Sequence, residues 1–128
     1  MLVADVIAGG AVTGGAYALL DVRAAAGAAL APHVALRHDD VLLVLEGELE
    51  LETGEGVRVL GAGEHASLVR RTPRRFRAVS DVHVLVLTVP AGLDELADLV
   101  GASLDEDDLA AVLAAAGISL LPRAYAGG

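Results

Sequence analysis

Residues 41–52 read VLLVLEGELELE and hold two different strand patterns on either side of a glycine. Val41–Leu45 form a continuous apolar run with the length of a buried strand. Glu48–Glu52 alternate strictly between acidic and apolar residues, which is typical of a strand with one solvated and one buried face. Because Glu46-Gly47 lie between the two runs and glycine adopts positive φ readily, the stretch predicts a β-hairpin.

The chain on both sides of this stretch repeats the pattern of short strands separated by glycine-containing turns. Thr53–Gly56 and Gly61–Glu64 are the clearest of these turns. Met1–Gly15 is rich in Gly and Ala without a clear period, and we assign it as an arm or an early strand. Short strands at this spacing indicate a β-sandwich or barrel. The remaining predicted strands are Tyr17–Arg23, Val57–Leu60, Ala66–Val69, Arg75–Val79 and Val82–Val89.

The period changes after Pro90. Apolar residues recur at helical spacing over residues 93–100, and Ser103 precedes Glu106 by the three residues of a capping box, which starts a second helical pattern. The tail from Ile118 to Pro122 is apolar enough to pack back on the barrel. We therefore expect helices only after Pro90.

Composition and charge exclude several classes of function. The formal net charge of −9 argues against binding to nucleic acid or to an anionic membrane surface, since both need a basic face. The chain has no cysteine, so disulfides and thiol chemistry are excluded. The N-terminus carries Asp5 and no basic segment, and the uncharged run Ile7–Leu20 is too short to span a bilayer. These features predict a cytoplasmic protein. All nine basic residues are Arg, and Lys, Asn and Gln are absent, as in translations of GC-rich genomes such as those of actinobacteria.

Two segments carry a resemblance to a known family. Residues 32–48, PHVALRHDDVLLVLEGE, resemble the first conserved motif of the cupins, and Gly61–Glu64 followed by Arg71–Phe76 resembles the second. Val89–Ile118 is similar to the helical tail of small actinobacterial cupins. The resemblance runs from about Tyr17 to Pro122. It implies a mainly β fold, a single jelly-roll barrel from about residue 17 to 90, with short C-terminal helices at about 92–122, in one domain spanning residues 1–128.

The resemblance also implies where a metal site would lie, and this sequence departs from it. Cupin metal sites use three histidines and one carboxylate; their positions fall on His33, Ala35, Asp40 and Arg74. Two of three nitrogen ligands are thus missing, and a charged guanidinium does not ligate metals. We therefore predict no metal and no other cofactor. One alternative stays open, in which His65 rebuilds a ligand set with His33.

The same positions are the candidate catalytic residues. The two-residue strand period places Arg74, Phe76 and Ala78 on the inner face of the barrel and Arg75 and Arg77 on the outer face. Arg74 would then bind or polarise an acidic or carbonyl head group. The alternative is that Arg74 belongs to a solvated cluster, as runs of charge usually do. The other members of that cluster would be Arg70, Arg71, Arg75 and Arg77.

The remaining histidines and acids complete the predicted site. His33 would donate or shuttle a proton, since histidine titrates near neutrality, and Asp40 would orient His33; the alternative for Asp40 is an ordinary loop acid. His38 and His65 are assigned to loops or strand edges, and His83 to a surface-facing position. The predicted substrate-binding wall of the barrel consists of Leu42, Val44, Phe76, Leu85 and Leu87.

Three functions follow from the resemblance. The first is a metal-independent cyclase or isomerase of natural-product biosynthesis that holds a polyketide-like, small apolar or acidic substrate in a water-poor pocket. The second is a non-catalytic barrel that binds or senses a small molecule. The third is a metal-dependent oxygenase. Open sheet edges and the apolar N-terminal segment also predict a homodimer.

Overall fold

A computed structural model describes residues 2–92 and 117–120 of the chain. Within these residues the protein is built of strands, with one helical turn near the N-terminus. In chain order the elements are β1 (Leu2–Ala8), α1 (Gly10–Thr13), β2 (Ala18–Ala24), β3 (Ala29–Ala35), β4 (Asp39–Glu46), β5 (Leu49–Thr53), β6 (Gly56–Leu60), β7 (His65–Leu68), β8 (Arg74–Ala78), β9 (Val82–Val89) and β10 (Ile118–Leu120).

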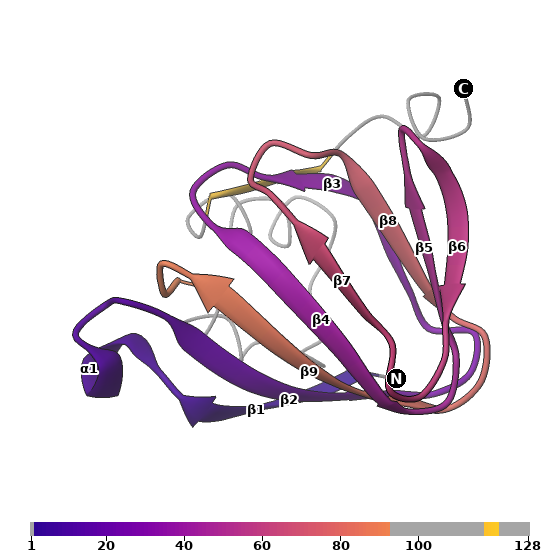
Figure 1. Ribbon diagram of the computed structural model, residues 1–128, viewed down its shortest axis with the longest axis horizontal. Helices are drawn as coiled ribbons and strands as arrows, with labels where there is room; N and C mark the ends of the chain where they lie inside the picture. Colours follow the sequence, from indigo (N-terminus) through magenta and orange to yellow (C-terminus); the bar gives the residue numbers. More distant parts are fainter. Residues whose placement is uncertain (1, 93–116, 121–128) are drawn as a thin grey trace.

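The strands form two antiparallel five-stranded sheets that face each other across the core (Figure 1). The first sheet has the order β1-β2-β9-β4-β7 and the second the order β10-β3-β8-β5-β6. From β2 onward the chain crosses between the sheets repeatedly, and only β5 and β6 follow each other within one sheet as a hairpin. This arrangement confirms the predicted mainly β jelly-roll fold.

The core lies between the inner faces of the two sheets. On β4, Leu42 and Val44 are buried and lie opposite Val86 and Val84 of β9. Leu49 and Leu51 fill the facing side from β5, as the alternation of residues 48–52 predicts. Burying an aliphatic side chain of this size contributes about 1.5–3 kcal/mol, so these rows supply much of the force that holds the sheets together.

The predicted hairpin at Glu46-Gly47 is wrong. β4 pairs with β7 and β9 in the first sheet, whereas β5 pairs with β6 and β8 in the second. Gly47 therefore carries the chain from one sheet to the other, with φ +83°. A Cβ at this position would overlap the carbonyl oxygen of Asp81, in the turn between β8 and β9. The glycine is required by this close approach as well as by its backbone conformation.

The two ends of the chain correct one prediction and confirm another. Met1–Gly15 contains β1, which pairs with β2, and the single turn α1, so the expectation that helices occur only after Pro90 is wrong. The turn reverses the chain between two antiparallel strands, and Gly14 in the left-handed conformation ends it. The tail packs back through the pairing of Ile118–Leu120 with β3. The helices predicted over 93–116 lie outside the described residues.

In the part of the chain that the structure describes, no helix has the length and hydropathy needed to cross a bilayer.

We expect Gly47→Ala to destabilise the protein by about 2–5 kcal/mol, the combined cost of a left-handed alanine and of an overpacked contact. The measurement is urea unfolding. Gly63→Ala is the matched control, because Gly63 has φ +86° and open space around its Cβ position. Gly63→Ala should lower the free energy of unfolding only by the cost of a left-handed alanine, about 1–2 kcal/mol. Equal losses in the two variants would contradict the close approach of Gly47 and Asp81.

The homodimer stays a prediction, and the fold locates its most apolar free edge. β1 is an edge strand of the first sheet, and Val3, Val6 and Ile7 on it are exposed. We expect a dimer mass by light scattering at tens of micromolar and a monomer for Ile7→Lys, since a charge on an edge strand opposes pairing. Val57→Lys, equally exposed on the edge strand β6, should stay dimeric. A monomeric wild-type protein would refute the prediction.

Candidate functional site

The positions that the cupin resemblance selects meet inside the barrel. His33 and Ala35 lie on β3, Asp40 on β4, and Arg74 and Ala78 on β8, and all five are buried. His33 is directly opposite Arg74 in the pairing of β3 with β8. The sequence therefore predicted correctly that these residues face inward.

Arg74 is the most enclosed of these side chains, with 1% of its side chain exposed. Its Nη1 donates to Oδ2 of Asp40, which joins β8 of one sheet to β4 of the other. Nε donates to the carbonyl of Thr72 at 3.0 Å, and Nη2 donates to the carbonyl of Val69 at 3.1 Å. Arg74 thus holds the loop between β7 and β8 against β4. The interpretation of Arg74 as a solvated surface residue is wrong.

The other arginines of the cluster follow the solvated interpretation. Arg75 pairs with Glu52 at 2.8 Å and Arg77 with Glu50 at 3.0 Å on the outer face of the second sheet. Arg70 pairs with Asp39 at 3.1 Å. The strand period separates the inward Arg74 from its outward neighbours, as the sequence predicted.

His38 is a site residue that the sequence analysis missed. It was assigned to a loop or strand edge, yet its side chain is 2% exposed and its Nε2 lies 3.3 Å from Oδ1 of Asp40. The histidine that the structure places beside Asp40 is thus His38, whereas the sequence analysis gave this role to His33. The sequence did contain a signal for this position of His38. His38 and Asp40 are two residues apart at the start of β4, and this spacing puts both side chains on the same face of the strand.

Burial shifts both members of this pair toward their neutral forms. Burial raises the pKa of Asp40, against the opposing influence of the positive charges of His38 and Arg74. Burial also lowers the pKa of His38, against the opposing influence of the Asp40 carboxylate. A buried acid and a buried base in contact, with their pKa values moved in opposite directions, form an arrangement that can exchange a proton with a bound molecule.

Thr88 is a second residue that was missed. It is fully buried on β9, directly opposite Asp40 of β4. Its Oγ1 is buried without a hydrogen-bond partner among the described residues. Oδ1 of Asp40 is also buried without a well-aligned hydrogen bond there, and its nearest cationic partner is Nε2 of His38 at 3.3 Å. Leaving such atoms unsatisfied costs about 1–3 kcal/mol each. The pair therefore offers one acceptor and one hydroxyl to a guest molecule inside the barrel.

The predicted apolar wall is only partly correct. Leu42 and Val44 are buried in the core, and Phe76 packs against it with its ring centroid 5.7 Å from that of His33. Leu85 and Leu87 are on the wrong face, because the register of β9 places Val84, Val86 and Thr88 inward. Leu85 and Leu87 are half-buried on the outer face of the first sheet. The available signal was His83, because a surface-facing His83 puts Leu85 and Leu87 on the same outer face by the two-residue period.

Comparison with known proteins gives the class of the fold. No protein-family model and no curated protein matches the sequence. Solved structures do match. KdgF from Halomonas sp. is 25% identical with a TM-score of 0.67, over 74% of this chain and 85% of that one. Ectoine synthase from P. lautus is 16% identical with a TM-score of 0.66, over 94% and 76%. A cupin-2 domain containing protein from Shewanella frigidimarina is 20% identical with a TM-score of 0.51, over 56% and 68%.

The two sheets described above have the architecture of these neighbours. The chain therefore has the cupin fold. Because most of these sequence identities are low, the similarity establishes the fold only. The chemistry of the site has to be inferred from its own residues.

The residues present do not fit the metal that the cupin fold implies. Ala35 has no donor atom, and the guanidinium of Arg74 is committed to Asp40. Among residues 2–92 and 117–120, no three side chains of His, Asp or Glu converge as a ligand set. The alternative set with His65 is wrong, because His65 is exposed on β7 opposite Leu43, on the outer face, whereas His33 is inside.

We expect Arg74→Met to cost about 3–5 kcal/mol of unfolding free energy at pH 8, since it leaves the Asp40 carboxylate buried without its partner. A carboxyl whose pKa is raised in the folded protein contributes stability at low pH and loses it as the pH rises through that pKa. The difference in unfolding free energy between the wild-type protein and Arg74→Met should therefore be smaller at pH 4, where Asp40 is protonated to a greater extent. The measurement is urea unfolding of both proteins at each pH.

Two controls accompany this variant. Arg77→Met removes an exposed ion pair and should cost no more than about 1 kcal/mol. Asp40→Asn combined with Arg74→Met should cost less than the sum of the single variants, because the two groups interact directly. Equal costs for Arg74→Met and Arg77→Met, or additive costs in the double variant, would contradict the buried pair.

Proposed function

We propose that this protein is a metal-independent cupin-fold cyclase or isomerase that acts on a small apolar or acidic, polyketide-like molecule. The observation that carries the proposal is the buried cluster of His38, Asp40 and Arg74, which combines the fixed positive charge of a guanidinium with a buried carboxyl group and a buried imidazole.

The cluster supplies the groups that such a reaction needs. Three of the five N–H groups of Arg74 are used within the protein, so two remain to stabilise a carbonyl oxygen as negative charge develops on it. His38 takes a proton from the carbon next to that carbonyl and returns it to the product. His33, on the neighbouring strand, is the second candidate for the proton transfer. No oxidant or reductant is needed.

The surroundings of the cluster favour this chemistry. The core side chains Leu42, Val44 and Phe76 give an apolar wall in which charged hydrogen bonds are strong and water is scarce. Oδ1 of Asp40, which His38 approaches at 3.3 Å, and the hydroxyl of Thr88 suit a hydroxyl or enol group of the substrate. We propose that the barrel opens a water-poor pocket beside the cluster, which would favour the folded, reactive conformer of a flexible substrate.

Access to the cluster runs through the loop between β7 and β8. Arg74 holds the carbonyls of Val69 and Thr72, and the backbone N–H of Arg71 donates to the carbonyl of Ala35 at 2.6 Å. Arg71 has φ +69°, a conformation that costs a non-glycine residue about 1–3 kcal/mol. We propose that this strained loop opens to admit the substrate.

The second candidate function is a barrel that binds a small acid without changing it. The observation in its favour is that Arg74 and Asp40 already satisfy each other, which makes the pair a structural support as well as a possible reactive group. The metal-dependent oxygenase is the least supported alternative, because two of its ligand positions carry Ala35 and Arg74.

The test measures proton transfer without knowledge of the natural substrate. A panel of small β-diketones and β-keto acids is incubated with the protein in D2O, and exchange of the protons next to the carbonyl is followed by NMR, together with cyclised products by mass spectrometry. We expect His38→Gln to lower the exchange rate by about 100-fold or more, the usual worth of a general acid or base. His65→Gln, on the outer face, should leave the rate unchanged.

The outcomes separate the three functions. Binding of a panel member in a thermal-shift assay without exchange or product would favour the non-catalytic barrel. Elemental analysis of protein purified without chelator tests the third function. About one equivalent of Fe, Ni, Mn or Zn, lost in His33→Ala, would overturn the metal-independent proposal.

A further inference from the structure

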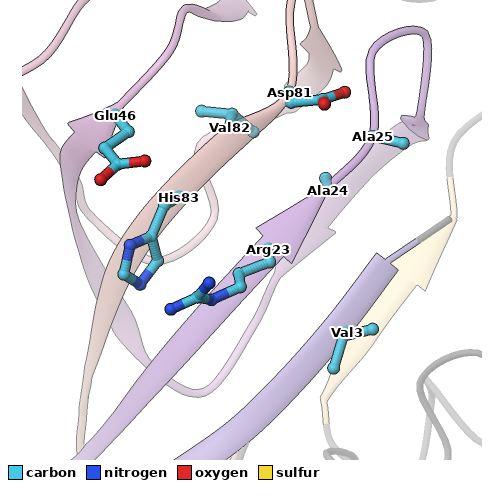
Figure 2. Close-up of a pocket in the computed structure, with 8 residues that line it drawn as sticks. All are labelled: Val3, Arg23, Ala24, Ala25, Glu46, Asp81, Val82 and His83. Atoms are coloured by element: carbon cyan, nitrogen blue, oxygen red, sulfur yellow. The ribbon is translucent and has the colours of Figure 1, made fainter.

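A second polar hollow lies far from the barrel interior, on the outer face of the first sheet. It encloses about 320 Å³ and is formed where β1, β2, β4 and β9 lie side by side (Figure 2). β4 carries Asp40 near its start and Glu46 at its end, which separates the hollow from the buried cluster by about 20 Å along the strand. The two sites therefore share no side chains.

The polar groups of the hollow come from a row of cross-strand neighbours, one residue each on β2, β9 and β4. Arg23 of β2 is opposite His83 of β9, and His83 is opposite Glu46 of β4. The register shift between Val44 and Glu46 brings Glu46 into this row. In Figure 2 the imidazole of His83 lies between the carboxylate of Glu46 and the guanidinium of Arg23. Since β9 separates β2 from β4, the Cα atoms of Arg23 and Glu46 are about 9.6 Å apart.

The carboxylate of Asp21 on β2 orients the imidazole of His83. Nε2 of His83 lies 2.8 Å from Oδ2 of Asp21, the neighbouring outward residue on β2. This hydrogen bond from His83 lowers the pKa of Asp21, so Asp21 stays ionised and keeps the proton of the imidazole on Nε2. The other ring nitrogen, Nδ1, is then an acceptor, and it has no partner among the described residues.

The guanidinium of Arg23 and the carboxylate of Glu46, at the two ends of the hollow, are also available to bind a ligand. The guanidinium of Arg23 reaches Asp21 only through Nε, at 3.7 Å, and its side chain is 69% exposed. Its two Nη groups and the carboxylate of Glu46 have no partner in the described part of the chain. A donor and an acceptor of opposite charge thus stand at the two ends of one hollow, and Val3 of β1, opposite Arg23 in the sheet, adds an exposed apolar side chain.

We infer that this hollow binds a small zwitterion, an amino acid whose carboxylate pairs with Arg23 and whose ammonium pairs with Glu46 and Nδ1 of His83. The aliphatic carbons of the ligand would lie against Val3. A ligand with one charge would leave either the cation or the anion of the hollow unmatched. The separation of Arg23 and Glu46 favours an amino acid whose two charges are several bonds apart.

The experiment compares three probes with the same carbon chain: 5-aminopentanoate, pentanoate and pentylamine. Each is titrated into the full-length protein and followed by the backbone amide NMR signals. We expect 5-aminopentanoate to bind about tenfold more tightly than either singly charged probe, the worth of one charged hydrogen bond. The shifted signals should include Arg23, Ala24 and His83 and exclude Asp40.

Matched variants test the two charged ends. Arg23→Gln and Glu46→Gln should each weaken binding of 5-aminopentanoate about tenfold, whereas Arg77→Gln and Glu55→Gln, exposed on the second sheet, should not. All four side chains are exposed, so folding is preserved. Equal affinity for pentylamine or pentanoate, unchanged affinity in Arg23→Gln or Glu46→Gln, or absence of binding at 50 mM (about 2 kcal/mol of binding free energy) would overturn the inference.

Discussion

The buried ion pair between Arg74 and Asp40 ties the two sheets of the barrel together at one end. Removing two charges from water costs several kcal/mol per ion, and the cost is recovered only when the remaining donors are satisfied as well. Here the carbonyls of Thr72 and Val69 take two further N–H groups of the guanidinium. The position of the loop after β7 and the burial of His38 both depend on this pair.

The pair also explains how a cupin barrel can be stable without the usual ligand set. A metal ion would provide a fixed positive charge that holds residues from several strands together. The guanidinium of Arg74 provides a charge at the same place and binds the carboxylate that the family pattern assigns to the metal. In the proposed function, proton transfer in the interior is assigned to His38 and Asp40.

The first sheet presents different chemistry on its two faces, and β9 contributes to both. Thr88 points inward, toward Asp40, whereas His83 points outward, toward Asp21. On the second sheet β8 alternates likewise, with Arg74 inward and with Arg75 and Arg77 paired with glutamates on the outer face. The alternation of a single strand thus places one polar group in the apolar interior and another in the outer hollow, where solvent reaches it.

The sequence by itself determined the fold class, most of the strand positions and the inward face of β8, because these depend on the local two-residue period and on turn residues. It did not predict β3 (Ala29–Ala35), the strand that carries His33. Only the tertiary structure decided which side chains meet. Asp40 and Arg74 are 34 residues apart, and their contact depends on how two sheets pair and face each other. The same holds for the burial of His38, for the position of Thr88 opposite Asp40, and for Gly47, whose crossing between sheets looks in the sequence like a hairpin turn. Local periodicity carries no information about register or about the partner strand, so these features follow from long-range packing.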